Sequence, residues 1–190
     1  MEIRLARDDD AEAIRGIYNV AVLETTSTFD LAPRSLAQQR EWLQERAGAH
    51  AVLVAEDAGE IVGFASLSPY RSRPAYNTTV ENSVYVDAGH VHRGIGRLLL
   101  TELLNAAGAR GFHSVMARIV GGHDASIALH TSCGFELVGT EREVGRKFGR
   151  WRDVVLMQYL VTTTPNSVEP TGHHDGTTSE RDLAETDTSG

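Results

Sequence analysis

Residues 78–104 read TTVENSVYVDAGHVHRGIGRLLLTELL, and this stretch decides the expected fold. From Thr79 to Val86 apolar and β-branched residues recur with period two, which predicts a β-strand whose even-numbered side chains share one face. After a short basic loop, residues 90–93, Gly94 and Gly96 open a run of leucines at helical spacing. The stretch therefore predicts a strand that passes through a glycine-rich turn into a helix.

This turn predicts a phosphate site. A strand that enters a helix through such a turn aims free backbone N–H groups and the positive end of the helix dipole at one point. Glycine leaves those N–H groups open to phosphate oxygens because it has no Cβ. Arg93 and Arg97 add positive charge. An ordinary glycine loop that caps a helix is the alternative.

The spacing of the glycines narrows the choice of coenzyme. A dinucleotide-binding fold needs a third glycine, and Leu99 stands in that position. The Gly-Lys-Ser/Thr ending of a P-loop is absent from the stretch. A loop that binds the pyrophosphate of another coenzyme remains.

The rest of the chain predicts an α/β sandwich with a mixed sheet. Alternating or continuous apolar runs indicate further strands at residues 2–6, 51–56, 61–67, 114–120, 135–142 and 152–159. Helical spacing indicates helices at residues 13–22, 33–47, 94–106 and 125–132. Asp8 to Asp10 are expected to cap the first helix, and residues 145–151 are expected to connect the last two strands.

Composition and charge indicate one ordinary domain. The chain has 190 residues, of which 41% are hydrophobic and 23% charged, with a net charge of -8. Residues 162–190 are acidic and almost free of apolar side chains, so we expect a disordered acidic tail after a domain at residues 1–161. Neither part has the basic character of a nucleic-acid binder.

The cysteine and histidine residues argue against a disulfide-bonded protein and against a metal-binding protein. Cys133 is a single cysteine, so no disulfide can form within the chain, and its position favours a small packed residue over a nucleophile. No signal peptide or membrane span is evident, so we expect a cytoplasmic protein without a membrane partner. The histidines show no metal-ligand spacing, and no metal is predicted.

Four stretches in the same order resemble the phosphinothricin and methionine sulfone/sulfoximine N-acetyltransferases of the GNAT superfamily. They are residues 79–86, 125–130, 134–135 and 144–153. The loop from Val91 to Gly96 is similar to the family motif Gln/Arg-x-x-Gly-x-Gly/Ala, with Val91 in the place of Gln or Arg. The resemblance covers residues 2 to about 160. It implies the GNAT fold and acetyl transfer from acetyl-CoA to the α-amine of a small amino-acid-like substrate.

The resemblance also implies site residues. Acetyl-CoA contacts fall on Val84, Tyr85, Val86, His92, Arg93, Gly94, Ile95, Gly96, Arg97 and, where the family has an Asn, His123. Substrate contacts fall on Arg71, Ser72, Arg73, Glu81, Asn82 and Ser83. The family also suggests a homodimer in which residues 147–153 cover the amino-acid pocket, and a plain β-turn is the alternative for that segment.

Two segments are further candidates for substrate contact. Arg71 and Arg73 stand in a non-periodic loop before the central strand, and a guanidinium matches a carboxylate with two hydrogen bonds. A solvated loop is the alternative reading. Phe29 follows a threonine-rich link between the first two helices and belongs either to the substrate pocket or to the core.

Glu81 is the candidate general base. The attacking amine must be neutral, whereas an α-amine has a pKa of about 7.7–8.0 and is mostly protonated at neutral pH. Glu81 is expected to take this proton directly or through water, with an exposed carboxylate or an ion pair with Arg71 or Arg73 as the alternative. Backbone N–H groups near Tyr85 and Val86 are expected to stabilise the oxyanion if the central strand separates from its neighbour.

The remaining alternatives concern His130 and the acceptor. His130 either protonates the departing thiolate or is a packed histidine bonded to the backbone. The acceptor is expected to be an amino-acid analogue such as phosphinothricin. Another amine, a protein N-terminus, or a non-catalytic acyl-CoA-binding module are the alternatives.

Overall fold

The computed structural model describes residues 1–161, so the predicted tail lies outside the described residues. The strands are β1 (Glu2–Leu5), β2 (Val52–Asp57), β3 (Glu60–Pro69), β4 (Thr79–Val86), β5 (Ser114–Val120), β6 (Glu136–Lys147) and β7 (Arg150–Leu160). The helices are α1 (Ala11–Glu24), α2 (Leu36–Glu45), α3 (Ile95–Ala109) and α4 (Asp124–Ser132). The predicted order of strands and helices is confirmed.

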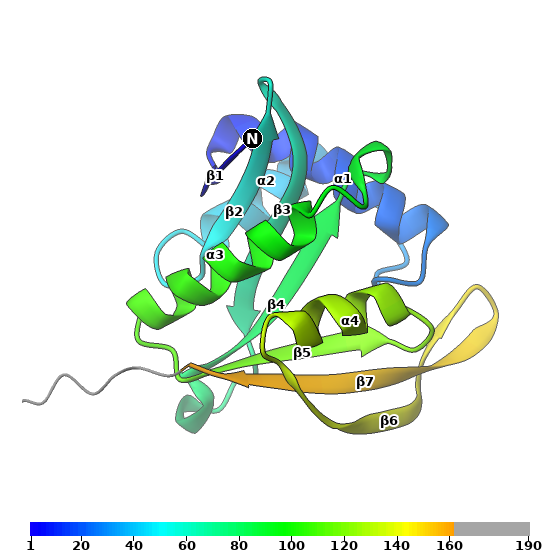
Figure 1. The fold of residues 1–190 in the computed structure, drawn as a ribbon. Helices are drawn as coiled ribbons and strands as arrows, with labels where there is room; N and C mark the ends of the chain where they lie inside the picture. Colours follow the sequence, from blue (N-terminus) through cyan, green and yellow to red (C-terminus); the bar gives the residue numbers. More distant parts are fainter. Residues whose placement is uncertain (162–190) are drawn as a thin grey trace, which may run out of the picture.

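The strands form one mixed sheet in the order β1-β2-β3-β4-β5-β7-β6. Helices α1 and α2 cover one face of the sheet, and α3 and α4 cover the other (Figure 1). β4 and β5 run parallel, and every other neighbouring pair in the described chain is antiparallel. The predicted α/β sandwich is thus confirmed.

The parallel pairing of β4 with β5 is short. It covers three positions, from Thr79 opposite Ser114 to Glu81 opposite Met116. Both strands continue beyond the last pair, to Val86 and to Val120. Figure 1 shows them diverging there, which opens the sheet at its centre.

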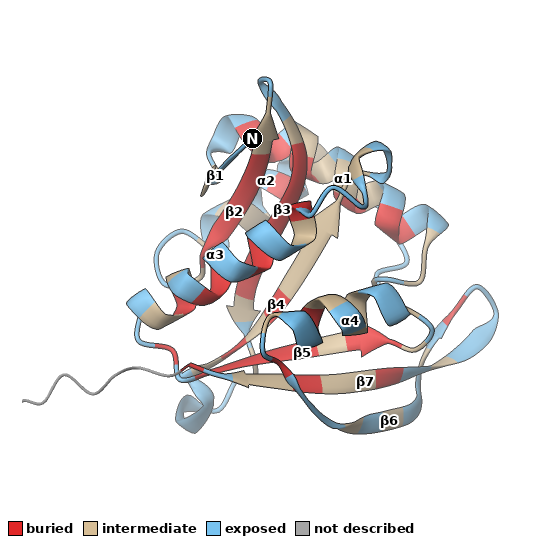
Figure 2. Cartoon of the chain, viewed as in Figure 1, coloured by how far each residue is buried: buried red, intermediate tan, exposed pale blue. Residues whose placement is uncertain are grey.

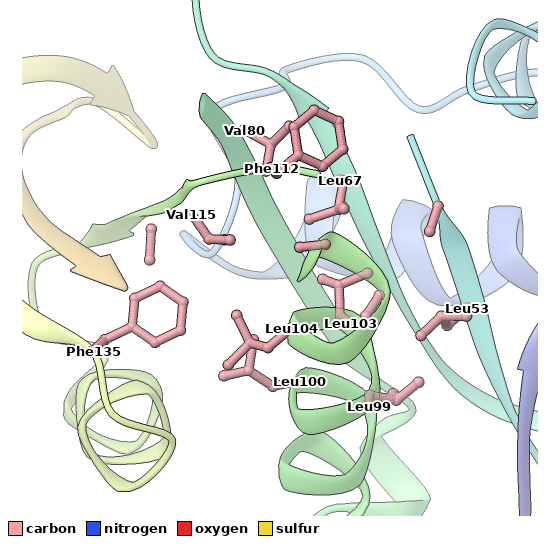
Figure 3. Packing of buried hydrophobic residues seen from close by; sticks show 14 of the residues in the cluster. Leu53, Leu67, Val80, Leu99, Leu100, Leu103, Leu104, Phe112, Val115 and Phe135 are labelled. Carbon is pink, nitrogen blue, oxygen red and sulfur yellow. The ribbon is translucent and has the colours of Figure 1, made fainter. Parts of the chain in front are cut away.

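The larger core lies between the sheet and α3. Leu99, Leu100 and Leu103 of α3 are all fully buried and belong to one cluster with strand residues such as Leu53 and Leu67 (Figure 3). Figure 2 shows the same division, with buried positions along the strands and the inner side of α3, and exposed positions on its outer side. This core holds the turn before α3 against the end of β4.

A second core covers the opposite face. Ile14, Tyr18 and Val22 of α1 pack against Val54 and Phe64 of the sheet. The two faces of β4 therefore belong to different cores, as its alternation predicted. Among residues 1–161, no helix is both long and apolar enough to cross a membrane.

The expected connection at residues 145–151 is wrong in its extent. β6 and β7 pair as far as Lys147 opposite Arg150, and only Phe148 and Gly149 form the turn. Both turn residues have positive φ, +49° and +73°, as a two-residue hairpin turn of type I′ requires. Charged side chains hide the strand pattern in the sequence because this end of the hairpin projects from the body of the protein (Figure 1).

The expected cap at Asp8 to Asp10 is confirmed in position, because Asp10 is the N-cap residue of α1. Asp8 to Asp10 form a 3-10 turn, however, and the Asp10 side chain makes no capping bond to α1. Instead, the buried Asp10 carboxylate accepts two 2.8 Å hydrogen bonds from Arg4 and one of 2.7 Å from the Arg7 N–H. The Arg4 guanidinium holds the pKa of Asp10 below its ordinary value, so this carboxylate fastens β1 to the start of α1.

Leu103→Ala should lower the free energy of unfolding by about 2–5 kcal/mol, because it removes a fully buried side chain from the larger core. Leu98→Ala, at a 45% exposed position of the same helix, is the matched control and should change it by less than about 0.5 kcal/mol. Urea denaturation followed by circular dichroism measures both. Equal losses would contradict the assignment of the buried face of α3.

Candidate active site

Two cavities meet where β4 and β5 separate. The first cavity, of about 380 Å³, includes Glu81, Asn82, Ser83, Arg118 and His130 in its lining. The second cavity, of about 640 Å³, includes Val86, His92, Gly94, Ile95, Gly96 and Arg97. Both are lined by Ser27, Val84, Tyr85, His123 and Ser126. These shared residues connect the two cavities through the opening in the sheet.

The backbone of β4 offers hydrogen-bond donors at this opening. The Asp87 N–H donates to Val62 O of β3 at 2.9 Å. In an antiparallel ladder the direction of the main-chain groups alternates, so Tyr85 bonds to β3 while Val84 and Val86 face the β5 side. The Tyr85 N–H itself points into the β3 pairing, and an oxyanion role for the N–H groups near Tyr85 and Val86 stays a prediction. The Val84 and Val86 N–H groups are directed into the opening.

The second cavity has the features of a phosphate cradle. Gly94 precedes α3 with φ +78°, a left-handed conformation that glycine adopts freely. The first N–H groups of α3 have no partner within the helix and point toward this end. A Cβ on Gly96 would lie 3.2 Å from Leu129 Cδ2, so glycine allows α3 to pack closely against α4. Together with Arg97, these donors fit a coenzyme pyrophosphate.

The predicted coenzyme residues are mostly brought together. All but Arg93 line the second cavity. Arg93 instead donates to Asp57, the last residue of β2, at 2.8 Å. His123 lies where the two cavities meet, with its Nε2 2.8 Å from Thr26 Oγ1.

Glu81 is a half-buried carboxyl group in the wall of the first cavity. Burial raises its pKa, the Arg118 guanidinium partly offsets this effect, and the Glu141 carboxylate adds to it. Arg118 is itself held by Glu141, with a distance of 2.6 Å between Nη2 and Oε2. Glu81 forms no ion pair with Arg71 or Arg73 in the described chain. A carboxyl group with a raised pKa is suited to exchange protons with an amine.

His130 and Asn82 form a buried network between α4 and the separated strands. His130 Nδ1 lies 2.8 Å from Ser126 O, and its Nε2 lies 3.0 Å from Asn82 Oδ1. Asn82 Nδ2 donates to Met116 O, at the last pairing of β4 with β5. Both neighbours of the imidazole are acceptors, which favours two ring protons, whereas burial lowers its pKa. The contacts match the packed histidine of the second interpretation, and the role of general acid stays a prediction.

Phe29 lies in the wall of the first cavity, as predicted. Its ring packs on Gly145 of β6 so closely that a Cβ there would lie 2.3 Å from Phe29 Cε2. Lys147, 2% exposed, donates from Nζ to Thr28 O at 2.8 Å. The β6–β7 hairpin therefore positions the loop that carries Phe29.

The loop from Arg71 to Arg73 does not reach either cavity. All three residues are exposed, and none contributes to the lining of the cavities. The Arg71 guanidinium lies over the rings of Tyr70 and Tyr76, at 5.0 and 5.6 Å from their centroids. The carboxylate clamp at Arg71 and Arg73 stays a prediction.

Sequence reasoning missed Tyr18, Arg34, Trp42, Arg46 and Arg118 in the first cavity. One signal was available, because Arg46, directly after α2, is four residues from Trp42, the spacing of neighbours on one helix face. Among residues 1–161, no group of three or more His, Cys, Asp or Glu side chains is placed to hold a metal ion.

Comparisons with known proteins agree with this geometry. Residues 3–156 match the family described as acetyltransferase (GNAT) domain. The chain belongs to the GNAT family. This GNAT protein is 44% identical to phosphinothricin N-acetyltransferase of Streptomyces coelicolor, over 81% of its own length and 92% of the relative's. It is 42% identical to L-methionine sulfoximine/L-methionine sulfone acetyltransferase of Pseudomonas aeruginosa, over 85% of its own length and 95% of the relative's.

A solved structure gives the same result for the fold. The GNAT phosphinothricin acetyltransferase of Sinorhizobium meliloti, in complex with acetyl-CoA, superposes with a TM-score of 0.82 and 36% identity. The match covers 89% of this chain and 95% of that one. The predictions of a GNAT fold, of an acetyl-CoA-dependent N-acetyltransferase and of acetyl-CoA as its cosubstrate are confirmed.

Glu81→Gln should leave the melting temperature unchanged or raise it by a few degrees. Because burial raises the pKa of Glu81, the folded protein binds its proton more tightly than the unfolded chain does. The stabilisation by protonated Glu81 is therefore present at low pH and is lost as the pH rises through the folded-state pKa. The difference in melting temperature between Glu81→Gln and the wild type should accordingly shrink toward pH 4. Scanning calorimetry between pH 4 and 8 measures the melting temperatures. Glu102→Gln, on the exposed side of α3, is the control. A melting temperature of Glu81→Gln below that of the wild type at pH 8 would contradict the burial argument.

Proposed function

We propose that this GNAT protein transfers the acetyl group of acetyl-CoA to the α-amine of a small amino-acid analogue such as phosphinothricin, methionine sulfoximine or methionine sulfone. The observation that carries the proposal is the position of Glu81, which lies in a cavity of about 380 Å³ that opens into the coenzyme cavity. The two named relatives support this class of acceptor.

Two parts of the protein contact acetyl-CoA in this proposal. The turn at Gly94 to Arg97 binds the pyrophosphate through backbone N–H groups, and the opening between β4 and β5 admits the pantetheine arm beside Val84 and Val86. The coenzyme supplies an acetyl group already activated as a thioester. The residues shared by both cavities then bring the acceptor and the acetyl donor together, and this proximity increases the rate of acetyl transfer.

Glu81 takes the proton that the acceptor amine must lose, directly or through water. Its raised pKa lies closer to that of an α-amine than an exposed glutamate's does, so proton transfer costs less. Arg118 limits this shift and keeps the carboxylate available as a base.

The other groups stabilise charge. The Val84 and Val86 N–H groups donate to the acetyl oxygen as it gains negative charge. His130, which lines the first cavity and can carry a proton on Nε2, is the candidate donor to the departing thiolate. Asn82 holds this imidazole at the point where the strands separate.

The purified protein should release coenzyme A from acetyl-CoA with saturable kinetics when phosphinothricin, methionine sulfoximine or methionine sulfone is the acceptor. Glu81→Gln should lower kcat by about 10²-fold or more at pH 7, the usual range for loss of a general base, and leave the Kd for acetyl-CoA unchanged. Glu102→Gln is the control. A thiol-reactive dye measures turnover, and calorimetry measures coenzyme binding.

The acceptor panel separates the alternatives. Turnover limited to simple amines or to a peptide with a free N-terminus would move the acceptor to another class. Binding of acetyl-CoA without turnover on any amine would indicate a non-catalytic binding module. Unchanged turnover in Glu81→Gln would remove the base from its assigned role.

We also propose a homodimer whose interface includes the β6–β7 hairpin. Val144, Phe148 and Trp151 are 50%, 56% and 60% exposed there, and such a group of apolar side chains marks an interaction surface. A second copy that covers this hairpin would also support Lys147 and the acceptor-cavity wall that it holds. A cytoplasmic location remains a prediction from the sequence.

Trp151→Glu should shift the protein from dimer to monomer, because it places a charge within the apolar surface. Sedimentation velocity at several concentrations measures the shift. Leu98→Glu, on the exposed side of α3, is the control and should leave the mass unchanged. A wild-type protein that sediments as a monomer would contradict the proposal.

A further inference from the structure

A third cavity lies at the sheet edge that β1 forms, between the end of α2 and the end of α3. Its volume of about 430 Å³ is within the range of about 300–1,000 Å³ that is usual for small-molecule sites. Residues of three segments, 5–8, 43–48 and 50–52, line it together with Arg110. Of these described residues, Arg46 alone also lines the first cavity, and none lines the second. The third cavity is therefore separate from the coenzyme cavity and borders the first cavity at one side chain.

The polar part of the third cavity is basic. Arg7, Arg46 and Arg110 all belong to its lining. Within residues 1–161, Arg7 and Arg110 form no ion pair, and Arg46 lies 3.7 Å from Glu45, whose side chain is 65% exposed. An ion pair of this length to an exposed carboxylate contributes little. The protein therefore leaves most of the positive charge of the three guanidiniums without a partner.

The acidic residues nearby do not balance this charge. Asp8 is the one acidic residue among the described residues of the lining, and Arg40, outside the cavity, lies 3.6 Å from it. The chain as a whole has a net charge of -8, so the lining is opposite in sign to the protein. A cleft lined by one sign of charge attracts counter-ions and raises their local concentration. The charge of the third cavity thus favours an anion.

The charge of Arg46 extends into the third cavity. Arg46 donates from Nη1 to Trp42 O and from Nη2 to Ser68 Oγ, both at 3.1 Å, and its buried Nε has no partner in the described chain. His50, another residue of the lining, stacks on Phe112 with the ring centroids 5.8 Å apart. Burial and, after it, the Arg46 guanidinium lower the pKa of His50. An anion in the cavity would therefore lie within the positive field of Arg46.

The guanidinium of Arg110 is held in place before a ligand binds. It donates from Nε to Gly48 O at 3.4 Å and from Nη1 to Ala106 O at 3.3 Å. Its Nη2 has no hydrogen-bond partner among residues 1–161 and remains available to an acceptor. A cation that is already restricted loses less entropy when it binds a ligand.

Apolar side chains form the rest of the third cavity. They are Leu5, Leu43, Ala47 and Val52. Leu5 is 55% exposed, whereas Val52 is 6% exposed. A ligand group that covered Leu5 would remove apolar surface from water, which is favourable. The lining therefore suits a molecule that has an apolar part next to its charge.

We propose that the third cavity binds a small organic oxyanion, in which a carboxylate or a phosphate group is attached to an apolar body. Arg7 and Arg110 bind the oxyanion, and Leu5 and Leu43 contact the apolar body. A guanidinium matches either kind of oxyanion with paired charge-assisted hydrogen bonds. The site is outside the acetyl-transfer machinery, so the proposal stands or falls independently of the proposed function.

Isothermal titration calorimetry with protein saturated with coenzyme A tests the proposal, because the coenzyme occupies the phosphate cradle of the second cavity. The probes are phenyl phosphate and 3-phenylpropionate, and the uncharged 3-phenylpropanamide is the matched control. At least one of the two anions should bind with a Kd of about 1 mM or lower. Its affinity should fall as salt is added. The amide should bind at least about tenfold more weakly.

Substitution of the arginines tests where the anion binds. Arg7→Gln and Arg110→Gln should each raise the Kd of the bound anion by about tenfold or more, the usual loss of a charge-assisted hydrogen bond. Arg110→Lys should recover part of this loss by keeping the charge. Arg142→Gln, at an exposed position of β6 outside the cavity, removes the same charge and is the matched control. It should leave the Kd within about twofold, because distant exposed charges are screened.

Melting temperatures show whether each variant folds. Should Arg110→Gln fail to fold, Arg7→Gln still tests the proposal, since the bond from the Arg7 N–H to Asp10 involves the main chain and is kept.

Nuclear magnetic resonance of the histidine rings locates the anion independently. The His50 signals, assigned by their absence in His50→Gln, should shift as the anion is added. A shift of the His123 or His130 signals without a shift at His50 would place the anion in the first cavity and overturn the proposal.

The choice of probe identifies the oxyanion. Binding of phenyl phosphate alone assigns a phosphate ester to the site, and binding of 3-phenylpropionate alone assigns a carboxylate; either result supports the proposal. Equal binding of the uncharged amide overturns it. So does an unchanged Kd in Arg7→Gln and Arg110→Gln, or the absence of binding by both anions.

Discussion

The structure depends on where β4 stops pairing with β5. Pairing ends at Glu81 and Met116, although both strands continue. A fully paired sheet would occupy the Val84 and Val86 N–H groups and leave no passage between its two faces. Ending the ladder early exposes these donors and joins a cavity on one face to a cavity on the other. Asn82 and His130 satisfy the polar groups at this point with side chains.

Each face then contributes a different part of the chemistry. The α3 face has a large core that fixes the glycine turn against β4, so that face suits a coenzyme held mainly by backbone groups. The α1 and α2 face has aromatic rings and arginines in the lining of the first cavity. Glu81 stands on this second face, next to the passage, where the proposed proton transfer would meet the acetyl group.

The features that could be predicted from the sequence are those determined by a local pattern of residues. The alternation in β4 and the glycines before α3 predicted the central strand, the turn, the helix and a phosphate site, because these features are contiguous in the chain. The individual coenzyme residues came from the family resemblance. Tyr18, Arg34 and Arg46 of the first cavity were missed because they come from separate segments that only packing brings together. The end of the β6–β7 hairpin was misjudged because charged residues replace the apolar alternation on a projecting strand pair. Arg93 was placed at the phosphates, but Asp57, distant in sequence, holds it elsewhere.

The contact between Phe29 and Gly145 couples the side-chain volumes at two positions that are far apart in the sequence. The ring fills the space that a side chain at position 145 would need, so neither residue can grow unless the other shrinks. Exchanging a large residue for a small one across this pair would move the cavity wall from the loop to the hairpin and keep the total packing nearly constant. The shape of the first cavity can therefore change through paired substitutions that leave strand β4 untouched.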